Sequence, residues 1–180
     1  VGICVAAWFI WKSWYVVDVA LLVIFAMSHA IIMLSGILLK PVEASINRMY
    51  YNEAASILRS MPDLTVIGVT GSYGKTSTKH YLNRILSEKY DVLMTPGSYN
   101  TTMRVIRTVR EMMKPYNEIF ICEMGAKNIG DIKEICDLVH PTIGIVTAVG
   151  EQHLESFKTI ENVQRTKFEL VDSLPENGLA

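Results

Sequence analysis

Residues 68–77 read Gly-Val-Thr-Gly-Ser-Tyr-Gly-Lys-Thr-Ser, and this stretch decides the fold. An apolar run that predicts a strand precedes it, and a pattern that predicts a helix follows it. Glycines let the backbone turn sharply so that its N–H groups face inward around an anion. The start of a helix points its positive dipole end at the same place. The stretch therefore predicts a phosphate-binding loop for a nucleoside triphosphate.

Each residue type in this loop has a chemical part in holding ATP. Lys75 would bring positive charge to the β and γ phosphates, and the Thr76 hydroxyl would bind Mg²⁺. The general pattern has a glycine where this chain has Val69. A glycine-rich turn with an incidental lysine is the alternative, and the flanking strand and helix argue against it. The expected nucleotide contacts are Gly71, Ser72, Tyr73, Gly74, Lys75, Thr76 and Ser77.

Strand and helix patterns alternate on both sides of the loop. The expected strands are 64–70, 91–94, 118–124 and 143–149, and the expected helices are 75–88, 101–114, 129–139 and 159–174. Thr159 is the expected N-cap of the last helix, with Glu161 in its first turn. This alternation predicts an α/β fold with a mostly parallel sheet covered by helices.

In parallel sheets, ligands bind beyond the carboxyl ends of the strands. Glu123 ends the third strand beside the phosphate loop, where an acidic residue usually orients Mg²⁺. A partly exposed glutamate paired with a lysine is the alternative. His153 follows the fourth strand, and spacing alone leaves a functional and a solvated histidine equally open. Lys167 lies in the last helix, where the pattern alone predicts a solvent-facing side chain.

The N-terminal region has a different composition from the rest of the chain. Residues 19–39 contain no Asp, Glu, Lys or Arg, and a helix of this length is about 31 Å long, close to the bilayer core thickness of about 30 Å. Aromatic side chains cluster before the run and Lys40 follows it, as expected at membrane interfaces. We expect a transmembrane helix; a signal peptide and a buried core helix are the alternatives.

Three regions are expected along the chain. Residues 1–40 form the membrane segment or segments, 41–60 a juxtamembrane helical connector that begins at Pro41, and 61–180 the nucleotide-binding domain. The connector could lie on the membrane surface or pack on the soluble domain. The first residues are apolar but too short to span, and no Met stands at position 1. We therefore expect a fragment of a longer protein.

Net charge and cysteine content give information on nucleic-acid binding and on the state of the thiols. The net charge is −1, which gives no basic field for nucleic acid. The three cysteines, Cys4, Cys122 and Cys136, are an odd number without metal-site spacing. We expect reduced thiols.

Four blocks in order resemble the central ATP-binding domain of the Mur ligases, and most closely the branch that adds D-alanyl-D-alanine to the cell-wall precursor. They are residues 68–77, Thr-Pro-Gly-Ser-Tyr-Asn at 95–100, Glu-Met-Gly-Ala at 123–126, and the region from Val149 through His153-Leu154-Glu155 to Lys167. The glycine pattern at 68, 71 and 74 is also that family's. Residues 61–180 would be the N-terminal part of such a domain.

The resemblance implies roles for individual residues. Lys75 and Thr76 would hold the ATP phosphates and the first Mg²⁺, Glu123 would bind magnesium, and His153 would help to hold a second Mg²⁺. Lys167 matches the lysine that the family carbamylates with CO₂, which requires a neutral amine. The implied catalytic residues are Lys75, His153 and Lys167. The implied substrate-binding residues are Thr95, Ser98, Asn100 and Thr101.

The implied activity is that of an ATP-dependent ligase that forms an amide through an acyl phosphate in peptidoglycan precursor synthesis. Its partners would be a carboxylate-bearing muropeptide-like substrate, an amine and membrane lipid, with the catalytic domain on the cytoplasmic side of a bacterial cell membrane. A membrane segment stands where the family has a soluble domain for the uridine diphosphate, and Thr101-Thr102 stands where amide side chains are expected. The alternatives are a poly-γ-glutamate-synthase-type ligase and a membrane-tethered nucleotide-binding regulatory protein.

Overall fold

The computed structural model describes residues 2–150 and 154–180, with side chains for 14–150, 155 and 157–180. The chain divides into two compact units, one up to Ile46 and one of Asn47–Ala180. The division lies between the expected boundaries at residues 40 and 60.

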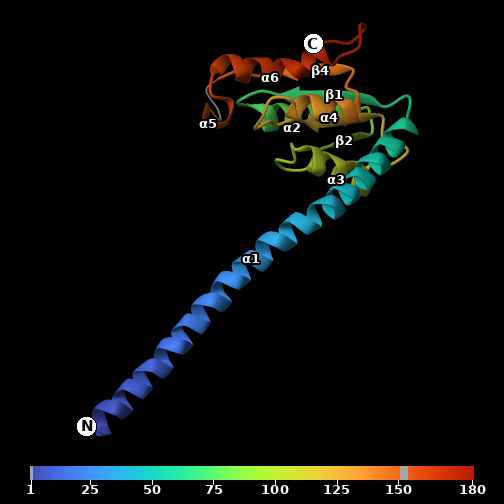
Figure 1. The fold of residues 1–180 in the computed structure, drawn as a ribbon. Coiled ribbons are helices and arrows are strands. Elements are labelled where there is room, and N and C mark those ends of the chain that lie inside the picture. The colour runs from blue at the N-terminus through green and yellow to red at the C-terminus, as the bar shows by residue number, and fades with distance from the viewer. Residues whose placement is uncertain (1, 151–153) are drawn as a thin grey trace. The chain divides into compact units, whose positions relative to one another are not determined.

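The second unit is built on one parallel sheet (Figure 1). Its strands are β1 (Thr65–Thr70), β2 (Val92–Met94), β3 (Ile119–Glu123) and β4 (Ile143–Val146), in the order β2-β3-β1-β4. All three strand pairs are parallel. The prediction of an α/β fold with a parallel sheet is confirmed, and β1, which leads into the phosphate loop, lies between two neighbours.

Helices connect and cover the strands. They are α2 (Lys75–Leu86), α3 (Thr102–Met112), α4 (Asp131–Val139), α5 (Leu154–Phe157) and α6 (Ile160–Asp172). Thr159 is the N-cap of α6, and its hydroxyl oxygen accepts a hydrogen bond from the Asn162 N–H at 3.3 Å. The N-cap prediction is therefore confirmed. The short helix α5 was not expected, because four residues carry too little periodicity to recognise.

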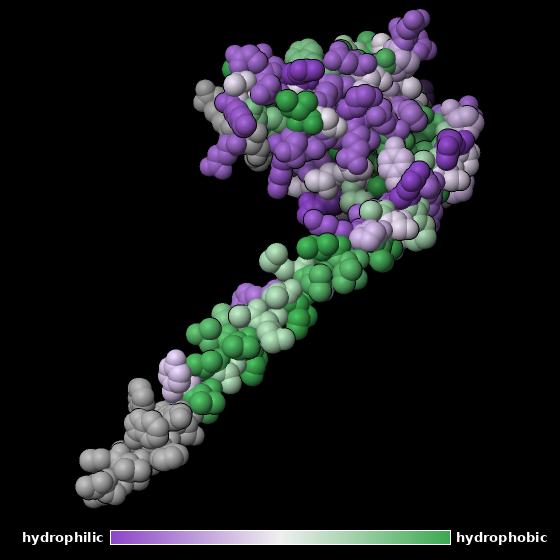
Figure 2. All heavy atoms as spheres, viewed as in Figure 1, coloured by the Kyte–Doolittle hydropathy of each residue, from purple (hydrophilic) through white to green (hydrophobic). Residues whose placement is uncertain are grey.

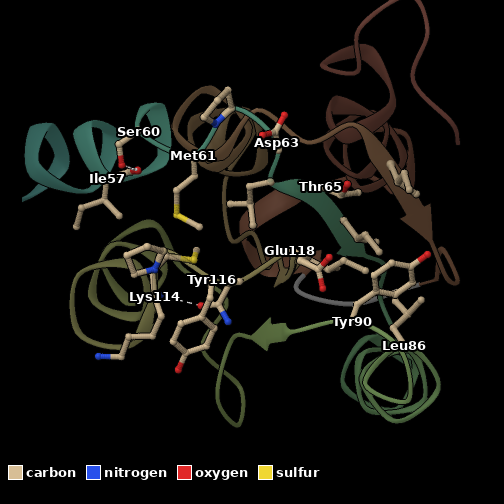
Figure 3. Close-up of a pocket in the computed structure, with 18 residues that line it drawn as sticks. Ile57, Ser60, Met61, Asp63, Thr65, Leu86, Tyr90, Lys114, Tyr116 and Glu118 are labelled. Atoms are coloured by element: carbon tan, nitrogen blue, oxygen red, sulfur yellow. Dashed lines mark hydrogen bonds between the residues drawn. The ribbon is translucent and has the colours of Figure 1, made fainter.

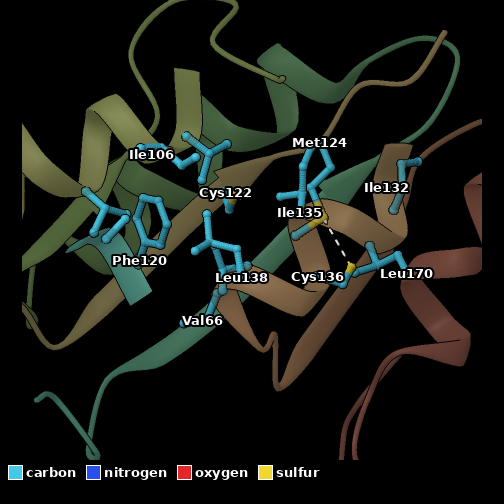
Figure 4. Close-up of a cluster of buried hydrophobic side chains, with 14 of the residues drawn as sticks. Val66, Ile106, Phe120, Cys122, Met124, Ile132, Ile135, Cys136, Leu138 and Leu170 are labelled. Carbon is cyan, nitrogen blue, oxygen red and sulfur yellow. Dashed lines mark hydrogen bonds between the residues drawn. The ribbon is translucent and has the colours of Figure 1, made fainter. Parts of the chain in front are cut away.

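Apolar side chains are buried on both faces of the sheet. Successive strand residues point to opposite faces, so that Phe120 joins one core cluster and Ile121 joins the other. The larger cluster lies between the sheet and α3, α4 and α6, with Ile106, Leu138 and Leu170 from those helices (Figure 4). Full burial of each such side chain contributes about 1.5–3 kcal/mol. Burial of both faces is typical of parallel sheets.

One helix, α1, runs over Gly2–Arg59 with Pro41 inside it. The expectation that a helix begins at Pro41 is therefore wrong. A proline in a helix interior removes one N–H bond and crowds the carbonyl four residues earlier, but α1 continues because helix-forming residues flank it on both sides. From Trp14 to Leu39 most large apolar side chains are exposed (Figure 2).

The last part of α1 belongs to the second unit and packs on its core. Ala54 is fully buried, and Tyr50 packs against the same core cluster. The Arg110 guanidinium of α3 lies 3.9 Å from the Tyr50 ring centroid, and its Nε donates to Glu53 Oε2 at 2.7 Å. Residues 47–59 are thus part of the folded domain.

Candidate functional site

Three glycines shape the connection from β1 to α2, each for a different reason. A Cβ on Gly68 would lie 2.7 Å from Leu170 Cδ1 of α6. A Cβ on Gly71, whose φ is +143°, would lie 2.0 Å from Thr147 Oγ1. Gly74 has φ +81° and is the N-cap of α2. The glycines at 68, 71 and 74 therefore follow from helix packing, loop packing and backbone conformation in turn.

The phosphate loop is hydrogen-bonded to the segment that follows β4. The Ser72 N–H donates to the Ala148 carbonyl at 2.6 Å, and the Ser72 hydroxyl donates to the Gly150 carbonyl at 3.0 Å. The Thr147 hydroxyl lies 3.1 Å from the Thr70 carbonyl, to which it donates. The predicted ligand residue Ser72 is buried, and its hydroxyl holds the loop in shape.

Lys75 lies over the loop at the start of α2. Its Nζ donates to the Gly71 carbonyl at 2.7 Å and to the Ser72 carbonyl at 3.3 Å. Burial lowers the pKa of Lys75, and the charge of Glu123 opposes that shift. No described side chain caps the N-terminus of α2, and the Lys75 ammonium lies on the loop that leads into this helix. This arrangement suits an anion such as a phosphate group.

Glu123 is the centre of the hydrogen-bond network beside the loop. Strand register pairs its Cα with that of Val69, one residue before the end of β1. Its Oε2 accepts from the Thr76 hydroxyl at 3.1 Å, and its Oε1 accepts from Asn100 Nδ2 at 3.4 Å. Its backbone N–H donates to the Thr95 hydroxyl at 3.1 Å. The carboxylate is 1% exposed, so these donors hold a buried anion.

The oxygen atoms at this point fit a magnesium ion. Mg²⁺ prefers oxygen ligands and takes one or two carboxylates together with substrate phosphates. Thr76 and Glu123 supply a hydroxyl and a carboxylate beside the phosphate loop. Among the side chains that the structure describes, at 14–150, 155 and 157–180, no three His, Cys, Asp or Glu form a metal-binding group. His153 lies outside the described residues, so the second Mg²⁺ stays a prediction.

Lys79 is a candidate site residue that the sequence pattern did not predict. It is fully buried in α2, and its Nζ lies 2.9 Å from Glu123 Oε2. A lysine in a helix ordinarily faces solvent. The available signal was spacing: Lys79 follows Thr76 by three residues and Lys75 by four, which places all three on one helix face.

Lys167 is buried in α6, and the expectation of a solvent-facing side chain drawn from pattern alone is wrong. It is 2% exposed and shares the inner face of α6 with Val163, Thr166 and Leu170. Burial and, next, the charge of Lys75 lower the pKa of Lys167 to about 8. The structure places no described side chain or carbonyl in hydrogen-bond or ion-pair contact with its amine.

Lys75 and Lys167 line one cavity of about 520 Å³ together with Asn100, Thr101 and Asp131. Of the expected substrate residues, Asn100 and Thr101 thus lie at the cavity. Thr95 is buried and accepts a hydrogen bond from the Glu123 N–H, Ser98 is exposed, and neither residue is part of the cavity lining. The cavity lies at the carboxyl ends of the strands, where parallel sheets bind ligands.

A larger cavity of about 900 Å³ lies at the other end of the strands, where they begin (Figure 3). Its lining includes the first residues of three strands, Thr65, Ile119 and Ile143, and few charged groups. It holds neither the phosphate loop nor the buried lysines, so the smaller cavity is the candidate active site.

Sequence and structure comparisons agree on the family. Residues 69–180 match the Mur ligase middle domain. The UDP-N-acetylmuramoyl-tripeptide–D-alanyl-D-alanine ligase of Escherichia coli is 34% identical over 133 residues, which are 74% of this chain and 29% of that protein. Its counterpart in Bacillus subtilis is 36% identical over 63% of this chain and 25% of its own length.

Solved structures give the same result. The MurF ligase of Thermotoga maritima in complex with ADP has a TM-score of 0.69 and 36% identity, covering 73% of this chain and 30% of that one. MurF of Acinetobacter baumannii has a TM-score of 0.70 and 28% identity, covering 73% and 29%. The chain therefore spans less than a third of the length of these relatives. On the match over residues 69–180, the chain belongs to the Mur ligase family through its middle domain.

Proposed function

We propose that this protein is an ATP-dependent ligase that joins D-alanyl-D-alanine to a UDP-muramoyl-tripeptide in peptidoglycan precursor synthesis. The relatives that carry this name support the substrates. The observation that best supports this chemistry is that Lys75 and Lys167 line the same cavity beside the phosphate loop. The relatives named above do not give the same support to a poly-γ-glutamate-type ligase.

The reaction has two steps. A carboxylate oxygen of the substrate bonds to the γ phosphorus of ATP, and the bond to the β–γ bridging oxygen breaks, so that ADP leaves. The amine nitrogen then bonds to the acyl carbon, and inorganic phosphate leaves while the amine loses a proton. Lys75 and the N-terminus of α2 stabilise charge on the transferred group, because catalysis of phosphoryl transfer is mostly positioning and charge stabilisation.

Thr76 and Glu123 are the proposed ligands of Mg²⁺, and Asn100 and Thr101 the proposed contacts to the substrate. When bound, the ion offsets negative charge shared by the phosphates and the incoming carboxylate. Lys167 is proposed to react with CO₂ as the neutral amine, forming an N–C bond and releasing a proton. The product is an anion in place of a cation, which makes this helix position fit to face a metal ion.

Phosphate release by the whole protein tests the reaction. We expect release only when ATP, the UDP-muramoyl-tripeptide and D-alanyl-D-alanine are all present. Release with glutamate as the amine instead would favour the poly-γ-glutamate type. Phosphate release that does not depend on the carboxylate or on the amine would favour a nucleotide-binding regulatory protein and contradict the proposal.

Replacing Lys75 tests the phosphate loop. Lys75→Ala removes a charge aimed at the transferred phosphoryl group, and we expect kcat to fall about 100-fold or more. Lys89→Ala, at an exposed lysine after the same helix, is the matched control and should keep its rate. A Lys75→Ala rate near that of the unchanged protein would exclude the assigned role.

The apolar part of α1 is proposed to anchor the ligase in the cell membrane, with the second unit on the cytoplasmic side. Residues 14–59 contain an 18-residue window of mean hydropathy 2.4 of which no part is buried. Length and composition alone support this part of the proposal. Lipid acyl chains would then cover side chains that are otherwise exposed to water.

A further inference from the structure

We infer that Lys79 is a positioning residue that fastens the loop of residues 95–100 to the Glu123 carboxylate and so couples this loop to the nucleotide site. Lys79 donates to two groups from different parts of the fold. One is Glu123 Oε2 at the end of β3, and the other is the carbonyl of Gly97 at the middle of the loop.

The loop is built to present that carbonyl. Gly97 has φ +48°, a left-handed conformation that favours glycine. Its neighbours form a turn in which the Tyr99 N–H donates to the Pro96 carbonyl at 3.0 Å. The two ends of the loop are held separately, by Thr95 on the Glu123 N–H and by Asn100 on the Gly125 N–H. Lys79 therefore holds the centre of the loop.

Glu123 links this loop to the phosphate loop. Its Oε2 accepts both from Lys79 and from the Thr76 hydroxyl, which stands one residue after Lys75. A change at Thr76 that moves the carboxylate also moves the ammonium paired with it, because neither charge is stable alone in a buried site. The centre of the loop then follows. The loop in turn ends at Asn100 on the wall of the 520 Å³ cavity.

Charge compensation alone is the competing explanation of Lys79. In that case a neutral pair would replace Lys79 and Glu123 without any effect on the loop. The two explanations differ in one measurable property, which is the hydrogen exchange of the loop backbone.

The test is amide hydrogen exchange in the whole protein that carries this chain. Lys79→Met keeps a long side chain but removes the charge and both hydrogen bonds. We expect the Tyr99 amide to exchange roughly ten- to a hundredfold faster, as loss of a hydrogen bond to a charged group predicts. Lys89→Met, at an exposed lysine, is the matched control and should exchange as the unchanged protein does.

Adding Mg²⁺ and ADP tests the coupling. In the unchanged protein we expect slower exchange of the Tyr99 amide, whereas in Lys79→Met we expect no slowing although ADP still binds. Unaltered Tyr99 exchange in a folded Lys79→Met protein, or equal slowing by ADP in both proteins, would overturn the inference. The measurement needs no ligase substrate, so its result does not depend on the proposed reaction.

Two further variants keep the test decisive if Lys79→Met does not fold. Lys79→Met with Glu123→Gln removes both charges, and we expect it to recover the melting temperature but not the protection of Tyr99. Gly97→Ala leaves the ion pair intact and has open space for its Cβ, but it strains the left-handed turn. We expect faster Tyr99 exchange there too. Normal protection in both variants would show that Lys79 serves charge compensation only.

Discussion

The amine of Lys167 is less basic than that of an ordinary lysine, because it is buried and lies near the charge of Lys75. At its pKa of about 8, half of the amine is unprotonated, whereas an ordinary lysine reaches that point near 10.5. The neutral fraction rises with pH through about 8. Reactivity toward CO₂ should rise over the same range, because only the neutral amine has a free electron pair.

We expect a carbamate on Lys167 whose occupancy increases from pH 7 to pH 9. Carbon-13 NMR with labelled bicarbonate measures it on the whole protein, and Lys167→Arg provides the control without the signal. A carbamate signal that survives Lys167→Arg, or that first rises near pH 10, would contradict the lowered pKa.

Removing the same amine tests its function. Lys167→Ala should lower the ligase rate about 100-fold, by analogy with loss of a group that stabilises developing charge. Short-chain carboxylates such as acetate should restore part of the rate, because they can take the place of the missing anion. If no carboxylate restores activity, the proposed carbamate is wrong.

Site residues differ in how far sequence could identify them. Lys75, Thr76 and Glu123 are predicted from a loop pattern and a strand end, and the structure places all three beside the phosphate loop. Lys79 and the burial of Lys167 depend on which helix face meets the sheet. That is decided by tertiary packing, which the residue type alone does not reveal.

The contact between β1 and α6 gives a prediction at the scale of elements. A Cβ on Gly68 would meet Leu170 Cδ1 at 2.7 Å. Gly68→Ala should therefore cost about 1–3 kcal/mol of stability through overpacking. Chemical denaturation of the single and double variants with Leu170→Ala measures the interaction.

The double variant shows whether the two substitutions compensate for each other in the free energy of unfolding. Leu170→Ala alone should cost about 2–5 kcal/mol through the cavity that it leaves. In that background Gly68→Ala should cost little, because the methyl group fills the new space. Equal costs of Gly68→Ala in both backgrounds would mean that helix packing does not explain the glycine.

The strands and the helices α2, α3, α4 and α6 were well predicted because their apolar periodicity is local. The strand ends lie within three residues of the expected ones, as Val146 against an expected 149 illustrates. Pro41 predicts a helix start because proline favours the first helical turn, but this preference is statistical. The flanking residues continue the helix, so α1 runs through Pro41. The sheet order has no local signal, because it depends on how crossovers pack.

The division of the chain into two compact units gives a prediction for the whole molecule. A protein that starts at Asn47 should stay folded and leave the membrane fraction, because residues 47–59 and the sheet remain together. Carbonate extraction and a thermal melt measure these two properties. A membrane location that persists without residues 1–46 would contradict the proposed anchor.

A protein that starts at Met61 is the matched control. It loses Ala54, which is fully buried, and the Arg110–Glu53 ion pair. It should melt at a lower temperature than the protein that starts at Asn47. Equal melting temperatures would mean that the end of α1 adds nothing to the domain.

The hydrogen bonds that join Ser72 and Thr70 to residues 147–150 have a consequence for protein engineering: Ser72 donates to the Gly150 carbonyl, and the Thr70 carbonyl accepts from the Thr147 hydroxyl. The ten-residue motif is not a portable module, because its shape depends on hydrogen bonds to a segment 77 and 78 positions later in the chain. Grafting residues 68–77 onto another nucleotide-binding scaffold should transfer the amino-acid sequence of the loop but not its conformation. Transplanting Thr147 to Gly150 with them is what should make the graft hold a phosphate.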